Sequence, residues 1–134
     1  MWSRYAIVDD SKFDRLVCGR IIEHLDPGAP LVEFQTGLEA YEYFLNGGYR
    51  GESMLILLDL NMPEMGGLEF LQKIHTNKKL KNLLGELNVI IITSSTLVED
   101  KLEALGYDCV LGIAEKPTKL GTIKRLFEKK KNGT

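Results

Sequence analysis

Residues 54–63 read MLILLDLNMP and carry the most informative pattern in the chain. Apolar residues run without interruption into the carboxylate of Asp59, and a turn-forming Asn-Met-Pro segment comes shortly after it. A Leu/Ile-rich run of this length without polar alternation is typical of a strand buried on both faces of a parallel sheet. We therefore expect Asp59 at the carboxyl end of such a strand, the edge where open α/β sheets bind their ligands.

The length and composition are those of an ordinary globular domain. The 134 residues are 44% hydrophobic and 27% charged, with a formal net charge of −2, and we expect one domain over residues 1–134. The balanced charge gives no electrostatic reason to expect nucleic acid or an anionic membrane as a partner. No apolar run reaches the roughly 18–20 residues of a membrane-spanning helix, and the N-terminus lacks the pattern of a signal peptide. A cytoplasmic location is expected.

Strand and helix patterns alternate along the chain. The predicted strands cover residues 5–8, 31–34, 53–60, 87–93 and 109–113. Each strand is followed by apolar residues at helical spacing, with Ser11 as the N-cap of the first helix and Thr36 or Gly37 opening the second. Five strand–helix units predict an α/β fold, in which helices cover both faces of a parallel sheet.

The cysteines and histidines do not predict a metal site. Cys18 and Cys109 fit no CxxC pattern, and both are expected to be small buried residues in a reducing compartment. His24 and His75 have no second ligand at metal-like spacing, and each lies near the end of a predicted helix. Trp2 stands alone in the pattern and carries no prediction.

Polar side chains stand at the ends of four predicted strands. The first strand ends at Asp9 and Asp10, the third at Asp59, the fourth at residues 93–95 (Thr-Ser-Ser), and the fifth leads to residues 115–117 (Glu-Lys-Pro). In the strand order 2-1-3-4-5, the first and third strands are neighbours and the order reverses between them. Three carboxylates would then meet at this switch point, beside a hydroxyl and an ammonium group.

Each of these groups has an ordinary explanation when taken alone. An Asp-Asp pair at a strand end often caps the following helix, and Asp59 could simply form an Asx turn. Together, the groups indicate phosphoryl chemistry. Clustered carboxylates repel one another unless a cation neutralises them, and Mg²⁺ prefers such oxygen ligands. With Lys116 beside it, Asp59 could attack phosphorus as a nucleophile and form an aspartyl phosphate.

In these residues the chain resembles the receiver domain of bacterial two-component response regulators, the CheY-like family. The motifs that carry the resemblance are IVDD at 7–10, LLDLNMPEMGG at 57–67, VIIITSS at 89–95 and AEKP at 114–117. The resemblance extends from Tyr5 to the last predicted helix. It implies a flavodoxin-like, doubly wound sheet of five parallel strands in the order 2-1-3-4-5, with five helices in an α/β/α arrangement.

The resemblance also implies a role for each acidic residue of the site. Asp59 would be the phosphoacceptor. Asp10 and Asp59 would bind Mg²⁺ directly, together with the backbone carbonyl of Asn61, and Asp9 would act mainly through metal-bound water.

The remaining site residues would act on the phosphoryl group. Thr93 would hydrogen-bond one of its oxygens and Lys116 would pair with it, and the bond between Lys116 and Pro117 is expected to be cis. The phosphoryl group would come from a sensor histidine kinase or a histidine phosphotransfer protein. The domain would be a signalling module, with no enzymatic activity beyond its own phosphorylation and dephosphorylation.

The expected output is a change in protein–protein binding within a phosphorelay. Phosphorylation would draw Thr93 and the following loop toward the new dianion. This movement would alter the surface formed by the fourth helix, fifth strand and fifth helix. A target protein, or a second copy of the chain in a homodimer, would dock there. Direct contact with nucleic acid and insertion into a membrane are not expected.

Two features depart from the family pattern. Family members usually carry Tyr or Phe three residues before the lysine, where this chain has Ile113, and Tyr107 comes too early to replace it. The usual coupling between the threonine and an aromatic ring is therefore not predicted here. The connection over residues 76–86 is also longer than usual, and it could be a surface loop, an extra helical turn or a partner contact.

Three other functions compete with the receiver interpretation. Haloacid-dehalogenase-type phosphatases also use a strand-end Asp and Mg²⁺, but they need a second Asp where this chain has Asn61, and they need a cap domain. A flavin-binding relative of the same fold would need a hydroxyl-rich loop after the first strand, where Asp9 and Asp10 would repel a phosphate. A pseudo-receiver that binds a partner constitutively stays open because Ile113 replaces the usual aromatic residue.

Overall fold

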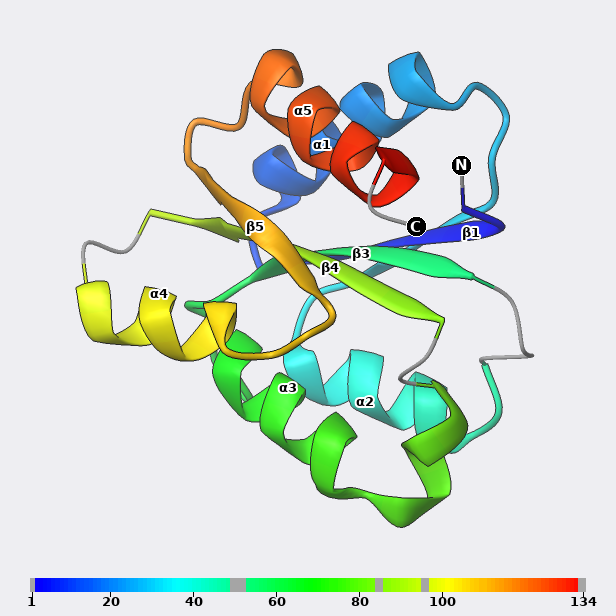
Figure 1. Ribbon diagram of the computed structural model, residues 1–134, viewed down its shortest axis with the longest axis vertical. Coiled ribbons are helices and arrows are strands. Elements are labelled where there is room, and N and C mark those ends of the chain that lie inside the picture. Colours follow the sequence, from blue (N-terminus) through cyan, green and yellow to red (C-terminus); the bar gives the residue numbers. More distant parts are fainter. Residues whose placement is uncertain (1, 49–52, 84–85, 95–96, 133–134) are drawn as a thin grey trace.

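The structure is a computed structural model, in which residues 2–48, 53–83, 86–94 and 97–132 are described. In this part of the chain five parallel strands form one sheet (Figure 1): β1 (Arg4–Val8), β2 (Leu31–Phe34), β3 (Met54–Asp59), β4 (Leu87–Thr93) and β5 (Val110–Glu115). Their order is β2-β1-β3-β4-β5, which confirms the predicted order. The order reverses between β1 and β3, as the sequence analysis expected for a doubly wound sheet.

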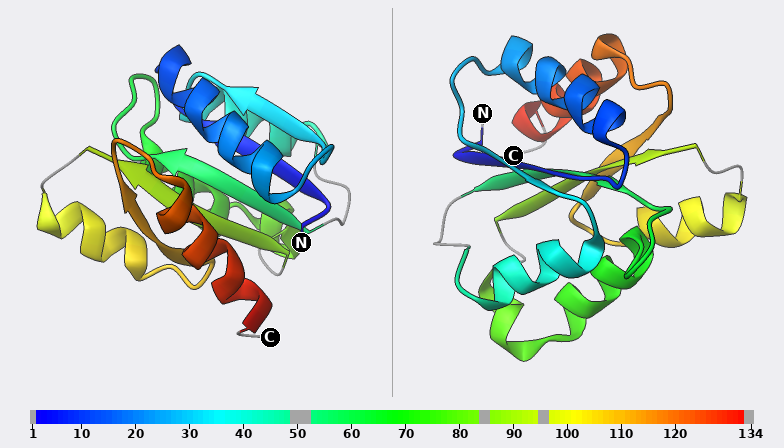
Figure 2. Two further views of the ribbon diagram at one scale, coloured as in Figure 1. Left: turned by 90° about the horizontal axis from the view of Figure 1, so that it is seen from above. Right: turned by 180° about the vertical axis from the view of Figure 1, so that it is seen from behind.

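Helices cover both faces of the sheet. They are α1 (Lys12–Leu25), α2 (Gly37–Leu45), α3 (Gly67–Thr76), α4 (Val98–Leu105) and α5 (Leu120–Asn132), with a 3₁₀ helix η1 (Lys78–Leu83) after α3. α1 and α5 lie side by side on one face, and α2 and α3 lie on the other with α4 toward the β5 edge (Figures 1 and 2). The predicted α/β/α arrangement is confirmed. No helix in the described part of the chain has the length and hydropathy needed to cross a membrane.

Local sequence explains where the first two helices begin. Ser11 is the N-cap of α1, and its hydroxyl accepts a hydrogen bond from the Asp14 N–H at 3.2 Å. Thr36 is the N-cap of α2 and accepts from the Glu39 N–H at 3.0 Å. Each cap satisfies a backbone donor that has no partner inside the helix. Both predicted helix starts are therefore confirmed.

All five predicted strands form, with small differences at their ends. Residues 31–34 and 87–93 form strands with the predicted ends, whereas β1 begins one residue before the predicted start and β3 is one residue shorter at each end than predicted. β5, however, extends beyond the predicted Ile113 because Ala114 and Glu115 pair with the end of β4, where Thr93 lies opposite Glu115. The long connection after α3 contains η1, so the extra helical turn considered above exists; residues 84–85 of that connection lie outside the described residues.

The core consists of two apolar layers that the sheet separates. Every residue of β3 and β4 is buried, as expected for central strands covered on both faces. Cys18 packs in the layer beneath α1 and α5, whereas Cys109 packs in the layer beneath α2, α3 and α4. Both are free thiols, and both are buried, as predicted. Trp2 carried no prediction, yet it is buried and packs edge-on against Phe127 of α5 at a ring-centroid distance of 4.9 Å.

The loop after β3 is fixed against the start of α2. The N–H groups of Gly37 and Leu38 donate to the carbonyls of Met65 and Glu64 at 3.1 and 3.3 Å. A Cβ at position 37 would collide with the Met65 carbonyl, so glycine is required for this approach. Glu64 and Met65 adopt positive φ values of 50° and 76°. The segment that follows Asp59 therefore has a strained but well-anchored backbone.

Candidate functional site

The carboxyl ends of β1 and β3 bring three aspartates together. Val8 lies opposite Leu58 in the parallel ladder, so the next residues, Asp9 and Asp59, lie side by side. Their side chains are buried, at 2% and 3% exposure, whereas Asp10 is exposed. One carboxylate oxygen from each of the three aspartates lies within 4.8 Å of the others. The acidic cluster predicted from the strand ends therefore forms.

Asp9 and Asp59 use their two carboxylate oxygens in different ways. Asp9 Oδ1 accepts a hydrogen bond from the Ser11 N–H at 2.9 Å, and Asp59 Oδ1 accepts from the Asn61 N–H at 3.1 Å. Each is an Asx turn that fixes the loop after its strand. The two Oδ2 atoms instead face the Lys116 ammonium. The Asx turn raised by the sequence for Asp59 therefore uses Oδ1, and Oδ2 is left facing Lys116.

Lys116 places one ammonium group among three carboxylates. Its Nζ lies 3.0 Å from Asp9 Oδ2, 3.0 Å from Asp14 Oδ2 and 3.3 Å from Asp59 Oδ2. The Lys116 N–H also donates to the Thr93 carbonyl at 2.9 Å, which joins the ends of β4 and β5. The peptide bond that precedes Pro117 is cis, as expected from the resemblance.

The ionisation of the buried groups reflects this crowding. Burial raises the pKa of Asp59 to about 6; the Asn61 N–H opposes this rise, the charge of Asp9 adds to it, and Lys116 again opposes it. Burial alone would lower the pKa of Lys116, but its contacts with Asp14, Asp9 and Asp59 outweigh burial and raise it. The site therefore favours a charged lysine and holds an unusually basic carboxylate at Asp59.

The acidic cluster has the donor set that a hard divalent cation requires. Asp9 Oδ2 is buried and has no hydrogen bond to the described residues, although it lies 3.0 Å from the Lys116 ammonium. One lysine does not balance three carboxylates at this edge. Carboxylates of Asp9, Asp10 and Asp59 could therefore hold Mg²⁺, which commonly binds through one or two carboxylates and several waters.

Thr93 lies at the end of β4, next to this cluster. Its side chain is fully buried, and its hydroxyl accepts a hydrogen bond from the Asn61 side-chain amide at 3.3 Å. Asn61 thus connects the loop after β3 to the end of β4 through its side chain, while its N–H holds Asp59. Ser95, the last residue of the predicted Thr-Ser-Ser end, lies outside the described residues.

The structure adds one residue that the sequence analysis missed. Asp14, in the first turn of α1, belongs to none of the motifs quoted above. Its carboxylate nevertheless accepts a hydrogen bond from Lys116 Nζ at 3.0 Å. The sequence contains a signal that points elsewhere, because Ser11 followed by an acid three residues later indicates a helix start. The contact with Lys116 joins residues 102 positions apart and follows only from the fold.

Ile113 and Tyr107 pack in different parts of the core. Ile113 lies in β5 opposite Ile91 and is half-buried against the core beneath α3 and α4. Tyr107 precedes β5 and packs on the His75 ring in the last turn of α3, with ring centroids 4.6 Å apart. Tyr107 therefore does not replace the aromatic residue that Ile113 displaces.

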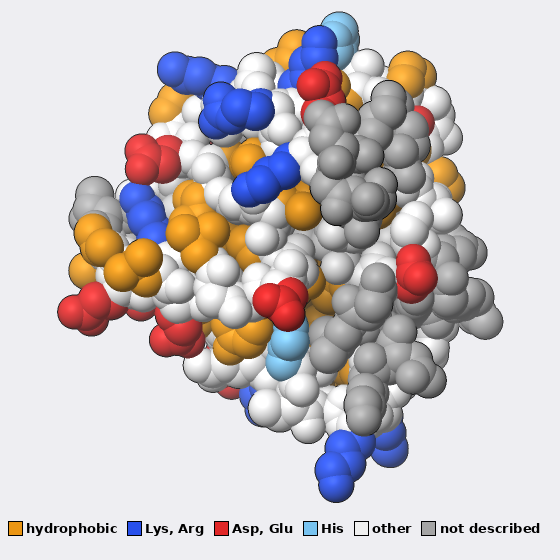
Figure 3. Space-filling view, viewed as in Figure 1, with side chains coloured by type: hydrophobic (Ala, Val, Ile, Leu, Met, Phe, Trp, Pro, Cys, Tyr) orange, Lys and Arg blue, Asp and Glu red, His pale blue; other side chains and the backbone are white. Residues whose placement is uncertain are grey.

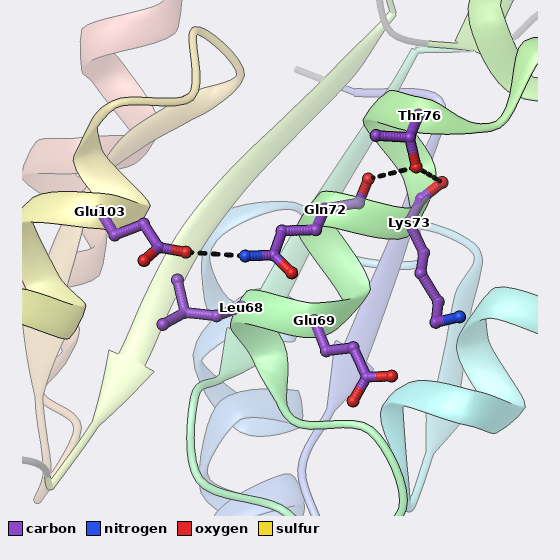
Figure 4. A pocket seen from close by; sticks show the side chains of 6 residues that line it. All are labelled: Leu68, Glu69, Gln72, Lys73, Thr76 and Glu103. Carbon is purple, nitrogen blue, oxygen red and sulfur yellow. Dashed lines mark hydrogen bonds between the residues drawn. The ribbon is translucent and has the colours of Figure 1, made fainter.

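A separate groove lies between α3 and α4 (Figure 4). It has a volume of about 810 Å³ and is lined by Leu68, Glu69, Gln72, Lys73, Thr76 and Glu103. Gln72 Nε2 donates to Glu103 Oε2 at 3.0 Å across it. None of the residues that line the groove belongs to the acidic cluster, so the groove is not the site indicated by the strand ends.

Comparison with known proteins identifies the family of the chain. The family model of the response regulator receiver domain matches residues 6–128. The two-component response regulator ARR15 of Arabidopsis thaliana is 30% identical over 132 residues, which cover 90% of this chain and 59% of that protein. A two-component response regulator from Cytophaga hutchinsonii has the same fold, with a TM-score of 0.79 and 20% identity over 96% of both chains.

A third similar structure is the CheX–CheY–BeF₃–Mg²⁺ complex from Borrelia burgdorferi, with a TM-score of 0.72 and 21% identity over 93% of this chain and 86% of that one. At this identity the likeness shows the fold. The chain spans between 11% and 59% of the length of the first three curated relatives that it matches. Because the family model matches most of its length, the chain belongs to the family of response regulator receiver domains, the receiver modules of two-component signalling.

Proposed function

We propose that Asp59 accepts a phosphoryl group in a Mg²⁺-dependent reaction and that this modification switches protein–protein binding in a phosphorelay. The observation that carries the proposal is the arrangement of Asp59 itself. One of its oxygens is fixed by the Asn61 N–H, and the other faces Lys116 inside a cluster of three carboxylates. A buried, oriented carboxylate with a raised pKa is well suited to act as a nucleophile.

In this proposal the acidic residues bind the metal, and the lysine binds the phosphoryl group. Asp10, Asp59 and the backbone carbonyl of Asn61 hold the metal directly, and Asp9 acts mainly through metal-bound water. The bound Mg²⁺ supplies positive charge that neutralises the transferring phosphoryl group. An Asp59 oxygen forms a bond to phosphorus, the bond from phosphorus to the donor breaks, and its electron pair leaves with the donor. Lys116 then pairs with the attached dianion.

The donor in this proposal is a phosphohistidine on a sensor histidine kinase or a histidine phosphotransfer protein. A phosphoryl group on an imidazole nitrogen leaves readily, and the phosphoaspartate that forms is itself labile to water. The chain therefore accepts the phosphoryl group and later loses it to water, with no enzymatic activity beyond its own phosphorylation and dephosphorylation.

In this proposal the chemistry takes place in the cytoplasm, and residues 1–134 form one receiver domain. The related complex that contains BeF₃ and Mg²⁺ supports the same ligand chemistry here.

Thr93 is the proposed link between the site and the surface. Its hydroxyl already contacts the loop after β3 through Asn61, and its carbonyl binds the Lys116 N–H. A new dianion on Asp59 attracts the hydroxyl and shifts the end of β4 toward the site. The α4–β5–α5 surface then changes, and a target protein or a second copy of the chain binds to it, without direct contact with nucleic acid.

A second candidate function is a pseudo-receiver that binds its partner constitutively. The observation that favours it is Ile113, because an aliphatic side chain half-buried against the core has no aromatic ring to reorient. The two functions differ in whether Asp59 is modified at all.

Intact-mass measurement after incubation with Mg²⁺ and acetyl phosphate or phosphoramidate tests the proposal. We expect the native chain to gain one phosphoryl group, and both the Asp59→Asn variant and native chain in excess EDTA to gain none. Asp108→Asn, which removes an exposed carboxylate, is the matched control and is expected to be labelled like the native chain. Labelling that persists in Asp59→Asn would contradict the assignment of the acceptor, whereas a native chain that stays unlabelled would contradict the proposal and favour the pseudo-receiver.

A further inference from the structure

Asp14 contacts the lysine of the site from outside the metal-binding cluster. It is the third residue of α1, three positions after the N-cap Ser11, and its side chain is 25% exposed. Its Oδ2 lies 3.0 Å from Lys116 Nζ, as close as the buried Asp9. The three carboxylate groups within one cluster are those of Asp9, Asp10 and Asp59, and Asp14 is not among them.

The local structure leaves Asp14 available for this contact. An acid at the third helical position often reaches back to the backbone N–H of the N-cap residue, which completes a capping box. Here the Ser11 N–H is already bound by Asp9 Oδ1 at 2.9 Å. Because the cap is satisfied by the loop itself, the Asp14 carboxylate can extend toward Lys116 instead.

The contact between Asp14 and Lys116 matters because the three carboxylates around the lysine match its three N–H donors. An ammonium group carries three N–H donors on a flexible stem, and here three carboxylates surround it. Under the proposed function, the metal and the incoming phosphoryl group compete with Lys116 for Asp9 and Asp59. Asp14 is the partner that this competition leaves in place.

We propose that Asp14 is a positioning residue that holds the Lys116 ammonium beside Asp59 during phosphoryl transfer. The inference rests on the proposed function and deepens it. Lys116 exchanges its contacts with Asp9 and Asp59 for contacts with the phosphoryl oxygens, while its hydrogen bond with Asp14 keeps Nζ within reach. Among the described residues, the other carboxylates that contact the lysine are those of Asp9 and Asp59, which the reaction itself occupies.

A double-mutant cycle on the phosphorylation rate tests the inference. The four proteins are the native chain, Asp14→Ala, Lys116→Met and the double variant, each incubated with Mg²⁺ and increasing phosphoramidate. We expect Asp14→Ala to lower the rate at saturating donor by about tenfold, and to have no further effect when Lys116 is already replaced. Asp14→Glu, which keeps the charge, is expected to recover part of the rate.

Matched measurements separate positioning from a general structural effect. Glu23→Ala, which removes an acid from the exposed side of α1, is expected to leave the rate unchanged, and thermal unfolding of each variant reports its folding. An unchanged or faster rate in Asp14→Ala, or an equal loss with and without Lys116, would overturn the inference while the proposed function stands. A native chain that cannot be phosphorylated would overturn both.

Discussion

The carboxyl edge of the sheet and α4 differ in how firmly the rest of the molecule holds them. At the edge, Asp59 and Thr93 are buried, and both accept hydrogen bonds from Asn61 in the loop after β3. In α4 only Ala104 is buried, and the N-cap residue Leu97 provides no side-chain hydrogen bond to the helix. The proposed chemistry thus lies on the well-packed part of the fold, and the proposed output on a part that little burial restrains.

The surface of α4 has a composition that fits this contrast. Leu97, Val98, Leu102 and Leu105 are 48–64% exposed, and apolar and acidic side chains gather over α4 at the left of Figure 3. A contiguous patch of exposed apolar groups often marks a surface to which another molecule binds. The comparison teaches that burial holds the proposed acceptor site firmly, whereas little burial holds the proposed output surface.

Removing the charge of Lys116 is expected to give the largest effect on stability. Lys116→Met keeps most of the stem but leaves three carboxylates without their cation, so we expect the free energy of unfolding to fall by about 3 kcal/mol in EDTA. Lys101→Met on α4 is the matched control, because it breaks an ion pair with Glu115, whose side chain is 72% exposed. We expect that variant to lose at most about 0.5 kcal/mol. Urea unfolding measures both.

Excess Mg²⁺ adds a second readout to the same experiment. A cation that binds the folded acidic cluster stabilises the folded chain, so Mg²⁺ is expected to restore part of the stability lost in Lys116→Met and to stabilise Lys101→Met only as much as it stabilises the native chain. Equal losses in the two variants would contradict the contrast between the edge and α4.

The pH dependence of stability gives an intermediate effect. The pKa of Asp59 rises from 3.8 to about 6 on folding, so between these values the folded chain holds a proton that the unfolded chain has lost. The free energy of unfolding therefore falls as pH rises through this window. We expect Asp59→Asn to be more stable than the native chain by about 2 kcal/mol at pH 7 in EDTA, and by much less at pH 4.

Unfolding curves in urea at a series of pH values measure this difference. Asp108→Asn is the control, because it removes an exposed carboxylate that lies outside the acidic cluster. A difference between Asp59→Asn and the native chain that stays constant with pH would contradict the raised pKa.

Substitution on α4 is expected to give the smallest effect. Leu102 is 64% exposed, so Leu102→Ser should change the free energy of unfolding by less than about 0.5 kcal/mol. Its rate of phosphorylation by acetyl phosphate should equal that of the native chain, because α4 contributes nothing to the acidic cluster. A loss of more than about 1 kcal/mol, or a slower rate, would show that α4 is coupled to the fold more tightly than its burial indicates.

The sequence predicted those features that local pattern determines. The apolar runs of β3 and β4 predict strands buried on both faces, and the acids at the ends of β1 and β3 predict the cluster that forms. The order of the strands then brings Lys116 to the same edge. These predictions succeed because hydrophobic periodicity and strand-end position are properties of short segments.

The features that the sequence did not reveal depend on long-range contacts. Asp14 matched the pattern of a helix start, and nothing near it in the chain indicates a lysine 102 positions away. β5 continues past Ile113 because β4 pairs with it, although Ala114 and Glu115 do not prolong an apolar pattern. Trp2 was uninformative alone, since its partner Phe127 lies at the other end of the chain.

The position of Trp2 makes it an intrinsic fluorescence probe of α5. It is the single tryptophan of the sequence, and its indole stands edge-on to Phe127 in α5, one of the elements of the proposed output surface. Indole emission changes with the polarity and packing around the ring. The fluorescence of Trp2 can therefore report changes in the packing of α5 against the core of an unlabelled chain, in real time, as donor and metal are added.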